Sequence, residues 1–250
     1  MKRIAVALIF LFALISAESA EAATIKMGTI KPTLTLAIPE DSVATAAQID
    51  LSGNIWVAGA VSATPPLPTP QPSSTALNPN NVQVDTPTVL PALTVLSVWK
   101  FSKTGELLKQ FTNSIRYVVY PSDFSIKGSK LTIRGLISTA PGDGFEVSMS
   151  TSGVFSAVTP YALKSKDPDL YQFQTKLSLW KSFTTSKAIT GISWKPSKSV
   201  RVLVRTSLKT KTPVAAYVMS GDLLSLNWLE SAGLVIFRHD QAGYQLTILK

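Results

Sequence analysis

Apolar and polar residues alternate one by one along most of the chain after its N-terminal segment. In 33–38, for example, Leu34, Leu36 and Ile38 alternate with two threonines and an alanine. Successive side chains of a strand point to opposite faces of a sheet, so this spacing is typical of a half-buried β-strand. Only 167–183 is ambiguous between helix and strand. The alternation therefore predicts an all-β protein.

The N-terminal segment is different. Lys2 and Arg3 precede twelve apolar residues, 4–15, and then a stretch of small residues. This order is typical of a secretory signal peptide, which we expect to span residues 1–23; an uncleaved anchor is the alternative. Twelve apolar residues are too few to cross about 30 Å of hydrocarbon as a helix, so no membrane span is expected after cleavage. The chain also has no cysteine. We therefore expect a bacterial protein that is secreted or held in the cell envelope and stabilised by its core alone.

Residues 64–91 contain eight of the sixteen prolines. Proline removes a backbone donor and fixes φ, which excludes a central strand or a helix there. We interpret 64–91 as a proline-rich loop inserted in a single domain, 24–250. A segment that docks to a partner as polyproline helix is the alternative.

A unit of four short strands recurs in the chain. Three segments have apolar residues at the same offsets: 54–61, 130–137 and 201–208. Each follows a strand-like lead-in, at 44–53, 118–128 and 189–199, and precedes a strand, a glycine turn and another strand; the turn glycines are Gly105, Gly153 and Gly221. Repeated four-stranded units of about 40–50 residues are typical of propeller blades.

The C-terminal segment adds a further hairpin, with strands 234–238 and 244–249 and a turn at Gly243. We expect N-terminal strands within 25–38 to pair with it, complete the last unit and close the ring, because an unpaired sheet edge invites association. The fold predicted is all-β and propeller-like, with about four four-stranded units. A β-sandwich is the alternative, since short, evenly spaced strands also suit it.

The stretch "DLSGNIWVAG", Asp50 to Gly59, and the later "SVWKFSKTGELL", Ser97 to Leu108, resemble repeats of the bacterial extracellular β-propeller families. The match is weaker in the second unit, and the third has Ser199 and Val200 at its first glycine position. The resemblance implies a propeller fold. Because these families share no single activity, it implies no functional residue.

Residues with catalytic or metal-binding chemistry are scarce. His239 is the only histidine, no serine lies in a G-x-S-x-G elbow, and no phosphate-binding loop motif occurs. Zinc sites need several His or Cys ligands, and calcium loops need alternating acidic ligands. Asp50, Asp143, Glu146 and the pair in 167–169 are better explained as turn residues. We therefore predict a non-enzymatic protein without a cofactor or metal.

Charge is the remaining signal. The net charge is +9 both with and without the signal peptide, and no acidic residue lies between Asp169 and Asp222, where nine cations lie. In "RVLVR", Arg201 and Arg205 share one strand face. We predict a basic face formed by Lys187, Trp194, Lys195, Lys198, Arg201, Arg205, Lys209 and Lys211, with Trp194 as an exposed aromatic.

Such a face would hold an anionic cell-envelope polymer or polysaccharide through salt-sensitive contacts. Nucleic acid is the least favoured partner, because export separates the protein from it. Three alternatives stay open: cations that serve only solubility, an extracellular enzyme or lyase on a propeller scaffold, and a structural subunit that closes its ring by self-association.

Overall fold

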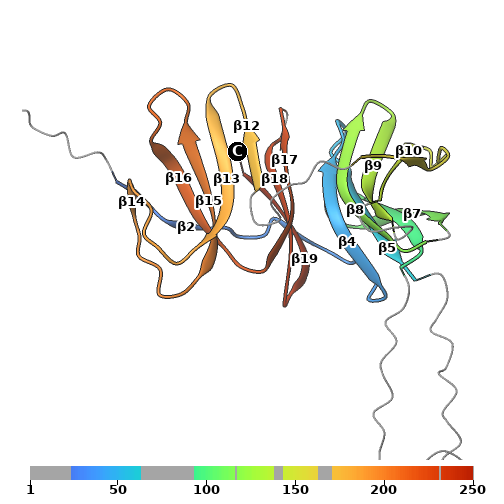
Figure 1. Cartoon of the computed structure of the whole chain (residues 1–250), viewed down its shortest axis with the longest axis horizontal. Helices are drawn as coiled ribbons and strands as arrows, with labels where there is room; N and C mark the ends of the chain where they lie inside the picture. The colour runs from blue at the N-terminus through green and yellow to red at the C-terminus, as the bar shows by residue number, and fades with distance from the viewer. Residues whose placement is uncertain are drawn as a thin grey trace, which may run out of the picture.

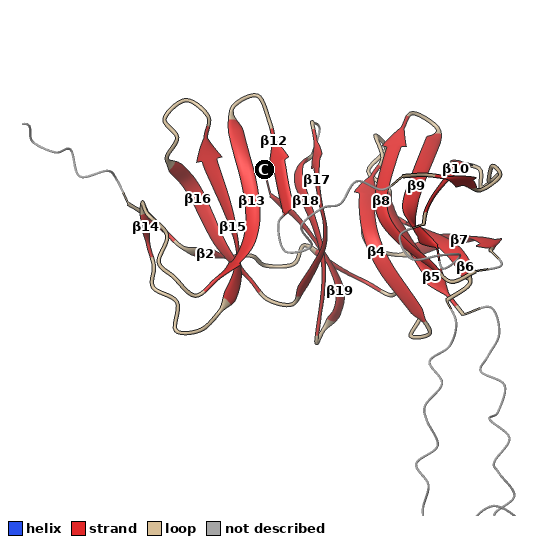
Figure 2. Cartoon of the chain, in the orientation of Figure 1, coloured by secondary structure: helices blue, strands red, loops and turns tan. Residues whose placement is uncertain are grey.

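The computed structural model describes residues 24–62, 93–115, 117–137, 143–162, 171–230 and 232–249. The regular elements of these residues are all β-strands, as Figure 2 shows. The predicted signal peptide and proline-rich loop, and Asp167–Asp169, lie outside the described residues. Within the described ranges there is no helix with the length and hydropathy to cross a membrane. The all-β prediction is confirmed.

Most strands form four sheets, three with four strands and one with five, and strands that follow one another in the chain mostly lie side by side. Sheet 1 has the order β4 (Ser42–Ile49), β5 (Ile55–Val61), β6 (Val95–Phe101), β7 (Leu107–Ser114). Sheet 2 has the order β8 (Val119–Lys127), β9 (Lys130–Ile137), β10 (Gly144–Ser150), β11 (Thr159–Pro160). These two sheets match the first two predicted units.

The second half of the chain forms two further sheets, each completed by an N-terminal strand. Sheet 3 has the order β12 (Tyr171–Gln174), β13 (Ser178–Thr185), β15 (Val200–Ser207), β16 (Pro213–Met219), β2 (Gly28–Thr29). Sheet 4 has the order β17 (Asp222–Leu229), β18 (Gly233–Asp240), β19 (Gly243–Leu249), β3 (Leu34–Leu36). A small parallel pair, β1 (Ile25–Lys26) with β14 (Ile192–Ser193), lies beside sheet 3. The predicted pairing of the N-terminus with the C-terminal hairpin is confirmed by β3 and β19.

The predicted third unit is wrong in two respects. Gly221 does not join two strands of one sheet; its turn leads from β16 of sheet 3 into β17 of sheet 4. A Cβ on Gly221 would lie 2.3 Å from the carbonyl oxygen of His239, because the chain passes directly over the end of β18. The lead-in strand of this unit is β13, and the predicted lead-in 189–199 belongs instead to the connection between β13 and β15. The ambiguous segment 167–183 forms β12 and part of β13 over its described residues.

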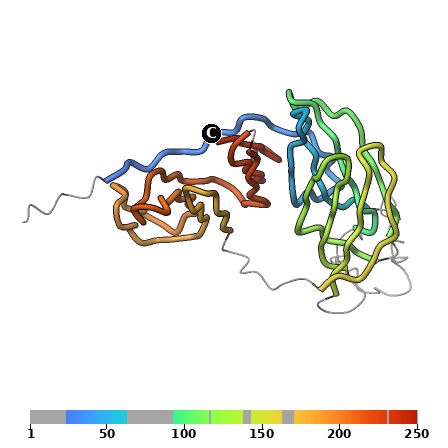
Figure 3. Tube along the Cα trace, turned by 90° about the horizontal axis from the view of Figure 1, so that it is seen from above, coloured from blue at the N-terminus to red at the C-terminus, as the bar shows by residue number. Residues whose placement is uncertain are grey.

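The sheets stack in the order 3, 4, 1, 2 and not in chain order (Figure 1). Strand β12 contacts β17, β4 contacts both β17 and β18, and β8 contacts β4 and β5. Seen from above in Figure 3, sheets 2 and 3 again lie at opposite ends of the row. Among the described strands, sheets 2 and 3 at the two ends do not meet, so the expected ring closure is not found there. Pairing β3 with β19 completes sheet 4, and the four blade-like sheets form an open row.

Apolar side chains fill each of the three gaps in this row. Trp56 and Phe145 pack between sheets 1 and 2. Trp99 and Phe237 pack between sheets 1 and 4. Between sheets 3 and 4, Trp180 packs with Leu203, Leu234 and Ile236. Trp56 and Trp99 are fully buried between the sheets and do not face solvent.

Three of the sheets share a structural detail that marks them as repeats. Each has a β-bulge between its first two strands, at Ala44/Ala46, Pro121/Asp123 and Leu223/Ser225. The residue opposite the bulge is Gly59 in sheet 1 and Gly135 in sheet 2, whereas sheet 4 has Arg238 at this place. Bulges at equivalent places indicate a common unit.

Candidate functional site

Sheet 3 and the N-terminal strands beside it have no acidic residue. Residues 171–221 contain nine lysines and arginines, 24–31 contain two more, and neither range contains Asp or Glu. We call this region the acid-free sheet. The two ion pairs found within the described residues lie elsewhere, on sheet 2, where Arg134 contacts Glu146 at 2.6 Å and Asp123 at 3.5 Å. The acid-free sheet thus contributes no carboxylate of its own to balance its eleven cations.

Arg201 and Arg205 lie on the face of β15 that is turned toward sheet 4. Leu203, between them, is fully buried in the cluster shared by sheets 3 and 4, and alternation places both arginines on the same side. The guanidinium Cζ of Arg201 lies 6.0 Å from the ring centroid of Tyr171. That of Arg205 lies 5.5 Å from the ring of Trp180. The predicted shared face is confirmed, and both side chains are half-buried beside aromatic rings.

Arg205 has a further partner that was not predicted from the sequence. Its Nε donates a 2.9 Å hydrogen bond to Oγ of Ser178, the first residue of β13. The register pairs Ser178 with Ser207 and Trp180 with Arg205, so both partners come from the neighbouring strand. The alternation of β13 places Ser178 and Trp180 on one face, but pairing β13 with β15 was needed to connect them with Arg205.

The five exposed lysines of the predicted face lie in two segments of the chain, and Lys181 is a further exposed lysine within β13. Lys187, Lys195 and Lys198 lie in the connection 186–199 between β13 and β15. Lys209 and Lys211 lie in the turn between β15 and β16, at the other end of β15. The seven residue steps of β15 separate its two ends by roughly 23 Å, at about 3.3 Å per residue. The connection starts and finishes at one of these ends, but its middle folds back, so that Gly191 lies next to Pro213 at the start of β16. The eight predicted residues therefore do not form one continuous face; the arginines lie between two lysine groups.

Trp194 is not the exposed aromatic that was predicted. It is half-buried and packs against the apolar cluster on the outer side of sheet 3, around Ile192, Val202 and Val204. The connection 186–199 folds back over this side of the sheet, and the indole helps to cover the two valines. Lys195 and Lys198, on the same connection, are exposed.

The acidic residues and the histidine form no comparable cluster. His239 is exposed on sheet 4, with its ring 4.5 Å from that of Tyr244. Nowhere in the described part of the chain do three His, Asp or Glu side chains gather closely enough to hold a metal ion. On sheet 2, the hydrogen bond to Glu146 raises the pKa of the Arg134 guanidinium.

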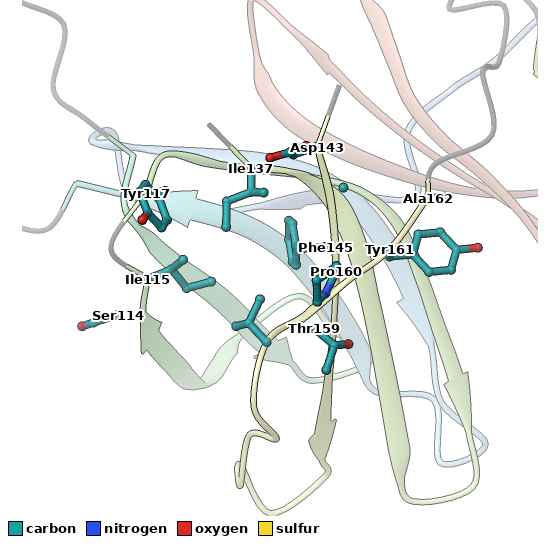
Figure 4. Close-up of a pocket in the computed structure, with 12 residues that line it drawn as sticks. Ser114, Ile115, Tyr117, Ile137, Asp143, Phe145, Thr159, Pro160, Tyr161 and Ala162 are labelled. Atoms are coloured by element: carbon teal, nitrogen blue, oxygen red, sulfur yellow. The ribbon is translucent and has the colours of Figure 1, made fainter. Parts of the chain in front are cut away.

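A pocket of about 890 Å³ lies at the far end of the row, on sheet 2 and the end of β7. Ile115, Ile137 and Phe145 contribute apolar surface, and Figure 4 shows Tyr117 at one side of it. The Tyr161 ring turns away in this view, and Arg134 stacks on it at 4.5 Å. Asp143 is the only acidic residue among the described lining residues. The pocket is thus separate from the acid-free sheet.

No protein-family model matches the chain, and no curated protein matches it. Among solved structures, two Synechocystis apocarotenoid oxygenase mutants, Trp149Ala and Glu150Asp, are similar at 9% and 8% identity, each with a TM-score of 0.32. Each alignment covers 85% of this chain and 51% of the oxygenase, so the chain spans about half the length of these proteins. At this level the similarity carries no argument about activity.

Proposed function

We propose that the protein is a secreted, non-enzymatic binding or scaffolding module that holds an anionic polymer of the cell envelope through the acid-free sheet. The observation that carries the proposal is the segregation of charge, with eleven cations and no acid on sheet 3 and its N-terminal strands. The positive potential of such a surface attracts polyanions. The signal-peptide pattern and the resemblance of Asp50–Gly59 to extracellular propeller repeats support an envelope location.

The two lysine groups suit a long ligand better than a small one. An extended polymer would contact both ends of the sheet, about 23 Å apart along β15, whereas a small anion would reach only one. The contacts are made by charge and are not specific for one sequence of sugars or phosphates. They weaken as the salt concentration rises, because the release of the polymer's counter-ions on binding then gains less free energy.

The arginines have a different role in this proposal. Arg201 and Arg205 lie on the inner face, and Arg205 is hydrogen-bonded to Ser178. Charge reversal of either would disturb the contact between sheets 3 and 4 as well as any ligand. The lysines of the connection 186–199 are exposed and are the better residues for a test.

The test is retention of residues 24–250 on isolated envelope fractions at low and high salt. The triple variant Lys187→Glu, Lys195→Glu, Lys198→Glu should lose most of the retention that the wild type shows at low salt. A matched control, Lys103→Glu, Lys127→Glu, Lys130→Glu, changes the net charge equally on exposed residues of sheets 1 and 2. Equal losses for both triples, or retention that salt does not change, would contradict the proposal.

A further inference from the structure

The two hairpin turns at one end of sheet 3 present a leucine among lysines. The turn between β12 and β13 and the turn between β15 and β16 lie side by side at the upper edge of Figure 1. The backbone N–H of Leu208 joins them by donating a 2.9 Å hydrogen bond to the carbonyl oxygen of Leu177. We call Lys176, Leu177, Lys209 and Lys211 the lysine tip.

The structure of the first turn holds Leu177 outward. Oγ1 of Thr175 accepts hydrogen bonds from the backbone N–H groups of Leu177 and Ser178, at 3.3 and 3.0 Å. The N–H of Thr175 donates to the carbonyl oxygen of Ser178 at 2.8 Å. The turn is therefore closed from both sides, and the Leu177 side chain remains 74% exposed. A single exposed leucine is ordinary on a protein surface, so the neighbouring residues decide its meaning.

The second turn retains a lysine where the backbone favours glycine. Lys211 has φ +58°, and it is the only non-glycine residue with positive φ among those described. Left-handed backbone is unfavourable for a residue with a Cβ. The turn holds it there through hydrogen bonds from the N–H of Lys211 to the Ser207 carbonyl oxygen, 2.9 Å, and from the N–H of Lys209 to Ser207 Oγ, 3.2 Å. Residues with such unfavourable backbone angles are found mainly at functional sites, where the role of the side chain outweighs the cost of the conformation.

The charges around Leu177 are all positive. Lys176, Lys209 and Lys211 are exposed, and sheet 3 has no acidic residue to neutralise them. Val214, next to the β15–β16 turn at the start of β16, is also exposed, at 46%. An apolar centre within a set of lysines matches the interface of an anionic bilayer, where apolar groups enter the headgroup region and lysines reach the phosphates.

We propose that the lysine tip docks reversibly on an anionic phospholipid bilayer. Leu177 enters the headgroup region, and the three lysines contact the lipid phosphates. This inference does not rest on the proposed polymer binding, because a soluble polyanion would engage the lysines but leave Leu177 without a role. One leucine and three lysines give adsorption to the surface and no deeper insertion.

The experiment is co-sedimentation of residues 24–250 with vesicles of phosphatidylglycerol and phosphatidylcholine, compared with vesicles of phosphatidylcholine alone. We expect binding to the anionic vesicles only. Leu177→Ser should weaken it by about 3- to 10-fold, the loss expected when a leucine is partly transferred from water. The matched control is Leu51→Ser, since Leu51 is 93% exposed in a turn of sheet 1 and lies outside the tip; it should bind as the wild type does.

The lysines are tested by Lys176→Gln, Lys209→Gln, Lys211→Asn, in which asparagine tolerates the left-handed backbone. About 1 kcal/mol for each lysine near an anionic surface corresponds to a loss on the order of 100-fold. The control Lys187→Gln, Lys195→Gln, Lys198→Gln removes the same charge from the other end of the sheet and should lose far less.

Three results would overturn the inference: no sedimentation with anionic vesicles, wild-type binding by Leu177→Ser, or an equal loss for Leu51→Ser. The polymer assay separates these results from the proposed function. Leu177→Ser should retain full binding to the envelope polymer, so failure with vesicles alone rejects only the lysine tip.

Discussion

The indole Nε1 of Trp56 donates a 2.9 Å hydrogen bond to Oδ2 of Asp50. The same carboxylate accepts hydrogen bonds from the backbone N–H groups of Ser52 and Asn54 and from the Asn54 side-chain amide. Trp56 is fully buried and its ring stacks on that of Phe111, with centroids 5.9 Å apart. Asp50 thus connects the first turn of sheet 1 with the core between sheets 1 and 2.

Replacing this carboxylate should destabilise the protein. Asp50→Ala leaves the buried indole N–H without an acceptor and opens the turn, so the free energy of unfolding should fall by about 2 kcal/mol. Urea denaturation followed by tryptophan fluorescence would measure it. Asp41→Ala, at an exposed turn residue, is the control and should change stability by less than about 0.5 kcal/mol. Equal effects would show that the four hydrogen bonds of Asp50 contribute little.

Asp50 also predicts a pH dependence. Burial raises the pKa of its carboxyl, but the hydrogen bonds from Trp56, Asn54 and Ser52 outweigh burial and hold the pKa below 3.8. A lowered pKa in the folded state stabilises the protein fully above the unfolded value, and this contribution is lost as pH falls through the folded pKa. The stability difference between wild type and Asp50→Asn should therefore be constant above about pH 5 and shrink below 3.8. A difference that grows in acid would contradict this assignment.

The glycines opposite two bulges should not tolerate a side chain. A Cβ on Gly59 would lie 2.2 Å from the Val43 carbonyl oxygen, and one on Gly135 would lie 2.1 Å from that of Tyr120. Backbone atoms cannot move away without breaking the sheet, so alanine at either site should destabilise by about 3 kcal/mol or more. Gly128→Ala is the control; it meets no atom within 4 Å, although its φ is +58°, and should lose only about 1 kcal/mol.

Sheet 4 fills the equivalent position with Arg238, which is 2% exposed. Its Nη1 donates to the carbonyl oxygen and to Oγ of Ser220, at 3.1 and 2.8 Å. Ser220 is exposed and can bond water instead, so we expect packing of the arginine stem to be the larger contribution. Arg238→Ala should lower the unfolding free energy by about 3 kcal/mol and Arg238→Met by only about 1 kcal/mol. Equal losses would show that the hydrogen bonds dominate.

Features that depend on residues close together in the chain could be predicted from the sequence, whereas those that depend on distant residues could not. Strands and tight hairpins such as β18–β19 depend on alternation and on a nearby glycine, and both were visible. Gly221 has the same local pattern as a hairpin glycine, yet it joins two sheets, because the choice depends on how β17 pairs with β18. The open row, with β2 and β3 added to distant sheets, depends on contacts far apart in the chain.

The candidate site was predictable to the same degree. The absence of acid over 171–221 and the shared face of Arg201 and Arg205 follow from the sequence alone. Alternation does not tell which face of β15 another sheet covers, so the inward position of these arginines was not foreseen. The packing of Trp194 on the outer apolar cluster and the exposure of Leu177 in its turn likewise could be seen only in the tertiary structure.

The most direct test of the acid-free sheet as a polyanion surface is the dissociation constant for dextran sulfate, measured by titration at several salt concentrations, with neutral dextran as control. We predict no binding to neutral dextran. For dextran sulfate, the logarithm of the association constant should fall linearly with the logarithm of the salt concentration. In the variant Lys187→Gln, Lys195→Gln, Lys198→Gln, this line should be less steep than in the wild type. The magnitude of its slope should fall by about two to three, close to one for each lysine. It should be unchanged in Lys103→Gln, Lys127→Gln, Lys130→Gln. Equal slopes for the wild type and the sheet 3 variant, or equal decreases in both variants, would contradict the account.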